Sequence, residues 1–435
     1  MHLNTLKAFR HAVYGTLERA KDALFNLLDA LVTEDRAHSL PELSLSPHFE
    51  RGWGSVYEAL EDGRINEKHL REVLVNFRPA SCSPLRLAVD ATGIARPKAV
   101  TSADRSAQMV HNLPEGETAR TYGWQFSTVV ALPEQPSSWT YVLSVQRIET
   151  AITAQQMAWT QLRELAPQLP TDTIILMDRG YDSAWLWCQL STLPVQGTLI
   201  RLKKNRCFYR PAPAPTGKRG APRKRGEKLQ PCDVTTHSDP DGTWSGSDTV
   251  GRPVQLRWWH KLTLKEAGWL KLCVIRVERP QAKRTKCDPR VSWFVWIGQA
   301  SADLPAATLS YVHRFSQEHG YRFDKQSLLW DKPKLRTPEQ FERWSHLVAI
   351  AHNVLVLSRY LVTPQLRPWE NRHRELSPQQ VRRAMSKLLP QLGTPARSPR
   401  PRGKSPGRPK GATIRKAERF HIIHQKPKVP PLVPK

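Results

Sequence analysis

The sequence predicts a mixed α/β fold in which a sheet flanked by helices follows a helical amino-terminal region. Two short apolar runs, at residues 85–90 and 173–178, each stop at an aspartate, which is typical of a buried strand that ends in an acid. A predicted hairpin at residues 125–132 and 140–148 and a predicted helix at residues 151–165 lie between them. Because ligands of such sheets bind at strand ends, the two aspartates mark the expected functional site.

The region before the sheet, residues 1–78, is predicted to be helical. Leu24, Leu27, Leu28 and Leu31 recur at the spacing of one helix face, and residues that break helices follow them. Strand patterns begin only after a turn-rich stretch beyond position 78, so the helical region forms a predicted unit of its own.

A basic stretch rich in proline and tryptophan interrupts the pattern at residues 205–290. It opens with a loop rich in Gly, Lys and Arg that contains Lys218 and Arg219, for which contact with phosphate and simple solvation are both open interpretations. Apolar runs at residues 254–260 and 270–277 then predict strands, so the whole stretch is expected to be a β-rich insertion.

The charge of the chain predicts a polyanionic partner. Lys and Arg number 66 against 39 Asp and Glu, which gives a net charge of +27 and a pI of about 10.2. Nucleic acid fits this excess best, although a ribosome-associated or membrane-surface protein could carry it as well. No apolar run reaches the roughly 18 residues of a membrane span. The first residues lack a secretory signal, so we expect a cytoplasmic protein with no membrane partner.

A third acidic residue lies in a pattern of its own. Tyr311, Arg314, Glu318 and Lys325 fall within about 60° of arc on one predicted helix, so a phenol, a guanidinium, a carboxylate and an ammonium share one stripe. The alternative is a solvated helix face with an ion pair between Arg314 and Glu318. For an aspartate at a strand end, the alternative is a turn or a helix cap.

Asp90, Asp178 and Glu318 are therefore the candidate catalytic and metal-binding residues. Carboxylates about 4 Å apart repel by about 4 kcal/mol at an effective dielectric constant of about 20, so three of them converge only around cations or with protonation. Mg²⁺ or Mn²⁺ is the expected cofactor. A pair of such ions would activate an attacking oxygen and stabilise the leaving oxygen of a phosphoryl displacement, so no protein nucleophile is needed.

These residues resemble a known family. The spacing of Tyr311, Arg314, Glu318 and Lys325 is that of the Tyr-x2-Arg-x3-Glu-x6-Lys (YREK) signature, which marks a cut-and-paste insertion-sequence group of the DDE transposases. Asp178, in Asp-Arg-Gly-Tyr-Asp, is similar to the second acid of that group. The resemblance implies a ribonuclease-H-like catalytic domain that is interrupted by a largely β insertion.

The resemblance also implies roles for single residues. It makes Asp90 the first acid, and it implies that Tyr311, Arg314 and Lys325 contact DNA phosphates near the cleaved end. Some members stack a flipped base on a tryptophan of the insertion, and burial in the core is the competing interpretation for any such ring. The candidates here are Trp258, Trp259, Trp293 and Trp296.

The function that the resemblance implies is DNA transposition. The enzyme would cleave DNA at the terminal inverted repeats of an insertion sequence and join the ends to target DNA. It would act with Mg²⁺ or Mn²⁺, as a homodimer in the synaptic complex, in the bacterial cytosol. The alternatives are a transposase-derived DNA-binding protein without catalytic activity and a basic RNA-associated protein.

The chain therefore divides into six expected units. They are a helical DNA-binding domain (1–78), the first part of the catalytic domain (79–204), the insertion (205–290), the second part of the catalytic domain (291–365), a helical segment (366–395) and a basic tail (396–435). The tail is expected to be disordered because it cannot bury enough apolar surface to fold alone. A packing or dimer domain is the alternative for the first unit.

Overall fold

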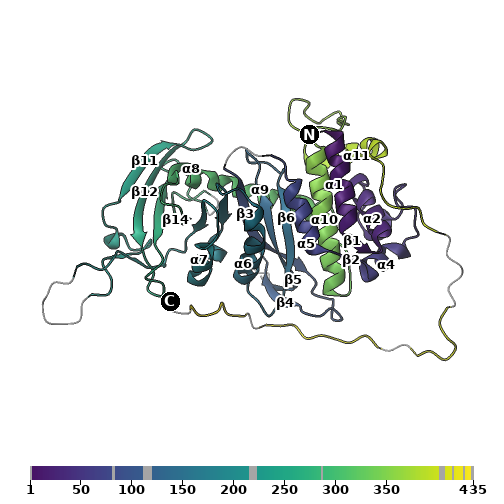
Figure 1. The fold of residues 1–435 in the computed structure, drawn as a ribbon, viewed down its shortest axis with the longest axis horizontal. Coiled ribbons are helices and arrows are strands. Elements are labelled where there is room, and N and C mark those ends of the chain that lie inside the picture. Colours follow the sequence, from purple (N-terminus) through teal and green to yellow (C-terminus); the bar gives the residue numbers. More distant parts are fainter. Residues whose placement is uncertain are drawn as a thin grey trace.

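One large sheet forms the centre of the molecule, with helices on both of its faces and a helical bundle at one end (Figure 1). We describe it from a computed structural model. The residues that it describes are 2–80, 84–110, 120–214, 223–285, 288–400, 407–413, 416–424 and 427–432. Within these ranges the sheet has ten strands, of which the three central ones are parallel. The mixed α/β class is thereby confirmed.

The central strands are those that the apolar runs predict. β3 (Arg86–Ala95) pairs in parallel with β7 (Ile174–Met177), which pairs in parallel with β8 (Gly197–Arg201). α6 (Ala154–Leu165) packs against this part of the sheet, and α7 (Ala184–Leu190) connects β7 to β8. The strand residues are apolar because both faces of the sheet are covered.

The predicted hairpin is confirmed, and it lengthens the first central strand. β5 (Arg120–Ala131) pairs antiparallel with β6 (Tyr141–Ile148), with β4 (Ser106–Met109) and with β3. The sequence predicts that the strand stops at Asp90. It continues to Ala95 because β5 supplies backbone partners along this whole length.

The strands of the insertion extend the same sheet. They are β11 (Gly242–Ser247), β12 (Pro253–Leu262) and β13 (Leu272–Glu278), and they continue into β14 (Val291–Gly298), which begins just after the predicted end of the insertion at residue 290. β14 pairs antiparallel with β8, so no break separates these strands from the central ones. β9 (Phe208–Tyr209) and β10 (Lys228–Leu229) form a separate hairpin. Lys218 and Arg219 lie outside the described residues, and the division of the chain into domains stays a prediction.

The amino-terminal helices form a bundle with two helices from the other end of the chain (Figure 1). These helices are α1 (Leu3–Thr16), α2 (Lys21–Thr33), α3 (Leu40–Leu43), α4 (Gly54–Asp62), α5 (Glu67–Asn76), α10 (Pro338–Ser358) and α11 (Pro378–Leu392). β1 (Leu17–Arg19) pairs with β2 (Arg64–Ile65). Arg10 Nη1 lies 2.6 Å from Asp29 Oδ1, and Arg10 also donates to the Gly393 carbonyl at 3.0 Å, just beyond α11. No described helix is both long and apolar enough to cross a membrane.

The segment of Tyr311, Arg314, Glu318 and Lys325, which the sequence predicts as one helix, is divided, and together with the short helix before it forms three pieces. They are α8 (Leu304–Leu309), the 3-10 helix η4 (Ser310–Arg314) and α9 (Phe315–Gln326). α9 covers β5, where the Gln317 side chain donates to Thr128 Oγ1 at 2.9 Å. His352 Nδ1, 2.6 Å from Asp324 Oδ1, ties α9 to α10. Burial alone would lower the pKa of His352, but the charge and the hydrogen bond of Asp324 raise it.

A short stretch of the carboxyl-terminal tail, residues 420–423, lies at one edge of the sheet. The Phe420 N–H donates to the Val100 carbonyl at 2.9 Å, and the Ile423 N–H donates to the Arg105 carbonyl at 2.9 Å. These bonds place this short stretch beside β4. Disorder of the tail as a whole stays a prediction.

Candidate active site

Three polar side chains form a row across the central strands. β3, β7 and β8 are in register up to the residues that immediately precede Asp90, Asp178 and Arg201. Because paired residues of neighbouring strands lie about 5 Å apart and point to the same face, the two carboxylates and the guanidinium lie side by side. Arg201 is not among the residues that the sequence predicts. Its one local signal is that it follows an apolar strand, as the two aspartates do.

Glu318 joins this row through Arg314. Arg314 Nη2 lies 3.0 Å from Asp90 Oδ2, and Arg314 Nη1 lies 3.5 Å from Glu318 Oε1. The side chain of Arg314 is 11% exposed and that of Glu318 is 49% exposed, so the arginine fills the space between the acids and Glu318 borders the solvent. The ion pair between Arg314 and Glu318 is therefore present, and the same arginine binds the first aspartate.

The charges of the site act on one another. Burial raises the pKa of Asp90 to about 6, Arg314 opposes this shift, and Asp178 and Glu318 add to it. Burial would lower the pKa of Arg314, but the charge of Asp90 and the other acidic groups around it raise that pKa above its usual value. Arg314 thus acts as an internal cation that partly compensates the acids.

Tyr311 and Lys325 lie at the two ends of the predicted stripe. The Tyr311 ring packs edge-on against Phe294 with centroids 4.8 Å apart, and burial raises the pKa of its phenol to about 12. Lys325 Nζ donates to Thr92 Oγ1 at 2.7 Å and to the Gly93 carbonyl at 2.9 Å, and burial lowers its pKa. Tyr311 therefore lies beside the row, whereas Lys325 binds β3 beyond Asp90.

Two further contacts fix the aspartates, one from Tyr321, which carries no sequence motif, and one from Gly180, which lies in the Asp-Arg-Gly-Tyr-Asp motif. The Tyr321 hydroxyl donates to the Asp90 carbonyl at 3.0 Å, which anchors β3 to α9. The Gly180 N–H donates to Asp178 Oδ1 at 2.8 Å. A Cβ at position 180 would lie 2.9 Å from that same oxygen, so a glycine lets the carboxylate keep this bond.

A comparison with protein families bears directly on this arrangement. The family model described as DDE superfamily endonuclease matches residues 12–262, which is more than half of the chain. The chain belongs to the DDE superfamily endonucleases. The matched residues include Asp90, Asp178 and Arg201, and the helix that carries Glu318 follows them.

Comparisons with individual proteins add less about this DDE endonuclease. No curated protein matches the chain. Among solved structures, a cryo-EM structure of the piggyBac transposase synaptic complex with hairpin DNA has a TM-score of 0.40 and 13% sequence identity. That match covers 90% of this chain and 79% of the other chain.

Enzymes of the DDE superfamily generally use divalent metal ions, and the donor atoms of this site suit them. Asp90, Asp178 and Glu318 offer carboxylate oxygens, which are the ligands that Mg²⁺ prefers. In the described part of the chain, no three Asp, Glu, His or Cys side chains converge closely enough to hold an ion. The Arg314 guanidinium lies between two of these carboxylates and contacts Asp90 Oδ2 and Glu318 Oε1.

Most of the candidate tryptophans of this DDE endonuclease lie in the core of the insertion. Trp259 and Trp293 are 2% and 6% exposed and stack on each other with centroids 5.6 Å apart. Trp296 is 2% exposed. Rings buried in this way have no free face for a base, so the structure favours the core interpretation for these three. Trp258 is partly exposed and stays a candidate.

Proposed function

We propose that this endonuclease is a transposase that cleaves DNA at the ends of an insertion sequence and transfers the strands into target DNA. The observation that carries the proposal is the row of Asp90 and Asp178 on neighbouring strands, to which Arg314 joins Glu318. Membership of the DDE superfamily supports nuclease chemistry, and the net charge of +27 supports DNA as the substrate.

In the proposed reaction Asp90, Asp178 and Glu318 hold one or two Mg²⁺ or Mn²⁺ ions. When bound, such ions activate an attacking water or 3′-hydroxyl and stabilise the leaving oxygen. Arg314, once released from the acids, would bind a substrate phosphate, to which a planar guanidinium can donate two parallel hydrogen bonds. Arg201 and Tyr311 border the same face and would orient that phosphate.

The finer assignments are also proposals. The order of the central strands and the position of α9 are compatible with a ribonuclease-H-like catalytic domain. The spacing from Tyr311 to Lys325 supports the YREK insertion-sequence group. The proposed partners are the terminal inverted repeats, target DNA and a second copy of the chain in a synaptic homodimer, in the bacterial cytosol. The helical region at residues 1–78 would bind the repeats.

A transposase-derived protein that binds DNA without cutting it is the second candidate. Arg314 favours it, because a guanidinium already compensates Asp90 and Glu318 without any ion. The two candidates make the same prediction for DNA binding and opposite predictions for DNA cleavage.

Cleavage of the DNA that flanks the gene separates the two candidates. We expect the full-length protein to cut a fragment that carries the flanking inverted repeats in Mg²⁺, and we expect a chelator to stop the cutting. Binding of the same fragment, measured by gel shift, should survive the chelator and weaken steeply with salt, because it depends on phosphate charge. Binding without any cutting in Mg²⁺ or Mn²⁺ would select the second candidate.

The raised pKa of Asp90 predicts how ion binding depends on pH. An ion needs the ionised carboxylate, and burial holds the pKa of Asp90 at about 6 in the folded protein. We therefore expect the affinity for Mn²⁺ to rise from pH 5 to pH 7, with a slope of about tenfold per pH unit below the pKa. Titration calorimetry with the Asp90→Asn variant as the control measures this. An affinity that does not change between pH 5 and pH 7 would contradict it.

The raised pKa of Asp90 also determines the direction in which the stability of the folded protein changes with pH. The pKa of Asp90 in the folded state lies above the usual value of an aspartate, so the folded protein binds more protons than the unfolded chain between about pH 4 and the folded pKa of about 6. The contribution of Asp90 to stability therefore falls as the pH rises through this window. It recovers as the pH falls back towards 4.

A further inference from the structure

The loop between α10 and α11 exposes two aromatic rings to the solvent. Tyr360 is 66% exposed and Trp369 is 76% exposed. A guanidinium lies over each of them, with Arg359 4.3 Å from the Tyr360 ring centroid and Arg367 5.7 Å from the Trp369 ring centroid. Two more exposed arginines follow. We call this set the arginine–aromatic surface: Arg359, Tyr360, Arg367, Trp369, Arg372 and Arg374.

Polar contacts, and not the two rings, hold this loop in place. Arg383 of α11 donates to both carboxylate oxygens of Glu370, at 2.9 and 3.1 Å, and to the Gln365 carbonyl at 3.0 Å. The hydrogen bond from Arg383 is the main reason that the pKa of Glu370 falls to about 2, so this carboxylate stays ionised and keeps the contact. Trp139 Nε1 also donates to the Leu376 carbonyl at 3.0 Å. The loop therefore presents its rings without needing them for packing.

The arginine–aromatic surface carries uncompensated positive charge. Among the described residues, no carboxylate forms a salt bridge with Arg359, Arg367, Arg372 or Arg374. The nearby carboxylate of Glu370 is already bound by Arg383. Glu375 lines the same cavity as Arg359, so the four guanidiniums outnumber the one nearby carboxylate that Arg383 does not bind. This excess suits a polyanion, since each guanidinium can donate to a phosphate.

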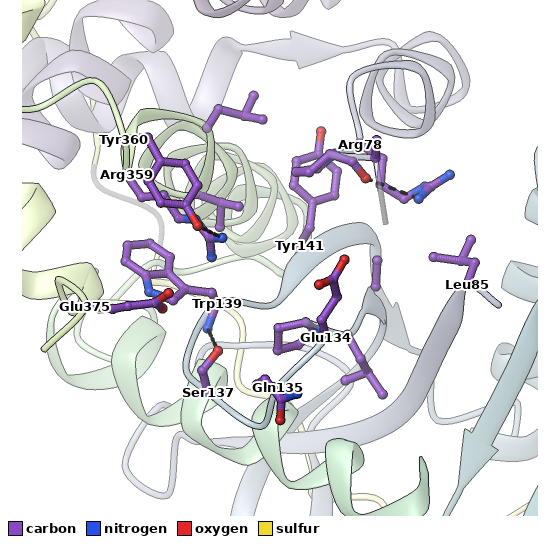
Figure 2. A pocket seen from close by; sticks show the side chains of 17 residues that line it. Arg78, Leu85, Glu134, Gln135, Ser137, Trp139, Tyr141, Arg359, Tyr360 and Glu375 are labelled. Atoms are coloured by element: carbon purple, nitrogen blue, oxygen red, sulfur yellow. Dashed lines mark hydrogen bonds between the residues drawn. The ribbon is translucent and has the colours of Figure 1, made fainter. Parts of the chain in front are cut away.

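A cavity of about 670 Å³ opens beside this surface (Figure 2). Figure 2 shows Arg359 and Tyr360 next to each other on one wall, with Trp139 and Glu375 close to them. The Arg359 guanidinium lies 5.7 Å from the Trp139 ring centroid and donates to the Tyr360 hydroxyl. The exposed Tyr360 ring and the Arg359 guanidinium form a wall against which a flat ring such as a nucleobase can stack, whereas the Trp139 ring is buried.

Contacts through one loop connect the surface to the helix that carries Glu318. The Ser137 N–H donates to Ser316 Oγ of α9 at 3.0 Å, and the Pro133 carbonyl lies 3.1 Å from His313 Nδ1 of η4. The same loop contains Trp139, which is bonded to the loop of the surface. The loop at residues 133–139 therefore packs against both the helix of Glu318 and the loop of the arginine–aromatic surface.

We propose that the arginine–aromatic surface binds unpaired DNA, with bases stacked on Tyr360 and Trp369 and phosphates bound by the arginines. Stacking requires a free base face, which a duplex hides, so the exposed rings favour an unpaired strand. The arginines alone would serve a duplex equally well. The proposal rests on the proposed function for the source of this strand, which is the DNA freed beside a cut.

Fluorescence anisotropy with a labelled oligothymidylate of about 15 nucleotides tests the proposal on the full chain in the presence of a chelator. We expect Trp369→Ala and Tyr360→Ala each to weaken binding about tenfold, and the double variant about a hundredfold, because each base stack is lost separately. Binding of a duplex of the same length should change little. Trp269→Ala is the matched control, since Trp269 is also an exposed tryptophan, at 43%, but lies in the segment between β12 and β13.

Three outcomes would overturn the proposal. The first is unchanged oligonucleotide binding in both ring variants, and the second is an oligoglutamate peptide that competes as well as the oligonucleotide. The third is tighter binding of RNA than of DNA of equivalent sequence. If the wild-type protein cuts no DNA, but Trp369→Ala weakens its binding of the oligonucleotide, the transposase proposal is rejected and the proposal for this surface is kept. If cleavage depends on Asp90, but the ring variants bind the oligonucleotide normally, the transposase proposal is kept and the proposal for this surface is rejected.

Discussion

We expect Asp90→Asn to lower the rate of DNA cleavage about 10³-fold or more, and Asp178→Asn to do the same. Each change keeps the shape of the side chain and removes the charge that would hold an ion between neighbouring strands. Ion-assisted phosphoryl transfer gains several kcal/mol from this interaction, and about 1.4 kcal/mol corresponds to a factor of ten in rate. Single-turnover cleavage of DNA with the flanking repeats measures the effect. Binding of the same DNA should stay within a few-fold of wild type.

Arg201 provides the matched comparison for this experiment. It stands in the same row as the two aspartates but offers no ligand to an ion. We expect Arg201→Gln to lower cleavage about 10- to 100-fold, which corresponds to one lost hydrogen bond to a charged group, and to leave Mn²⁺ binding intact. Wild-type cleavage by Asp90→Asn would remove that residue from the catalytic set. Loss of Mn²⁺ binding in Arg201→Gln would contradict a role at the phosphate.

The largest effect on stability is expected at the buried pair of Arg10 and Asp29. Their side chains are 1% and 2% exposed, so Asp29→Ala leaves a buried guanidinium without its counter-ion. Loss of one partner of such a pair costs about 3–5 kcal/mol of the free energy of unfolding. Because Arg10 also donates to the Gly393 carbonyl, the loss should loosen α1 and the end of α11 together. Urea unfolding followed by circular dichroism measures the change.

An exposed pair of the same chemistry serves as the control. Arg19 and Asp62 lie 3.6 Å apart with side chains that are 69% and 61% exposed. Arg19→Ala should change the free energy of unfolding by less than about 1 kcal/mol. Replacing Arg10 by Met together with Asp29 by Leu should recover most of the stability that Asp29→Ala loses. Equal losses at the exposed and the buried pair would show that burial does not set the cost.

The sequence predicted the individual strands of this fold better than it predicted which strands pair with one another. The apolar run before Asp90 predicts a strand because burial on both faces demands it, but the strand pairs with β5 up to Ala95, beyond the end of that run. At Gly93 an added Cβ would lie 2.1 Å from the Gln108 side chain, a contact between segments that no local pattern relates. The union of the insertion strands with β8 is equally invisible, since it depends on pairing between distant segments.

Some residues of the candidate site could also be predicted from the sequence, and others could not. Asp90 and Asp178 could be located because two apolar strands in one domain each lead to an aspartate, whereas an arginine in that position, Arg201, has no comparable signature. The sequence predicts one helix for Arg314 and Lys325, but the 3-10 helix η4 ends at Arg314. The two residues therefore have different neighbours, and Lys325 binds the backbone of β3. Periodicity alone could not show this break.

The pairing of β14 with β8 gives the insertion strands and the strands of the two aspartates a single hydrogen-bonded ladder. From β11 to β3 each described strand is hydrogen-bonded to the next, with one register shift, between Trp259 and Leu262 of β12. If bent DNA pushed on the outer strands, the sheet would therefore twist, and the twist would extend to the strands that carry Asp90 and Asp178. An insertion pressed by a distorted duplex would change the spacing of these carboxylates, and one lying on a straight duplex would not.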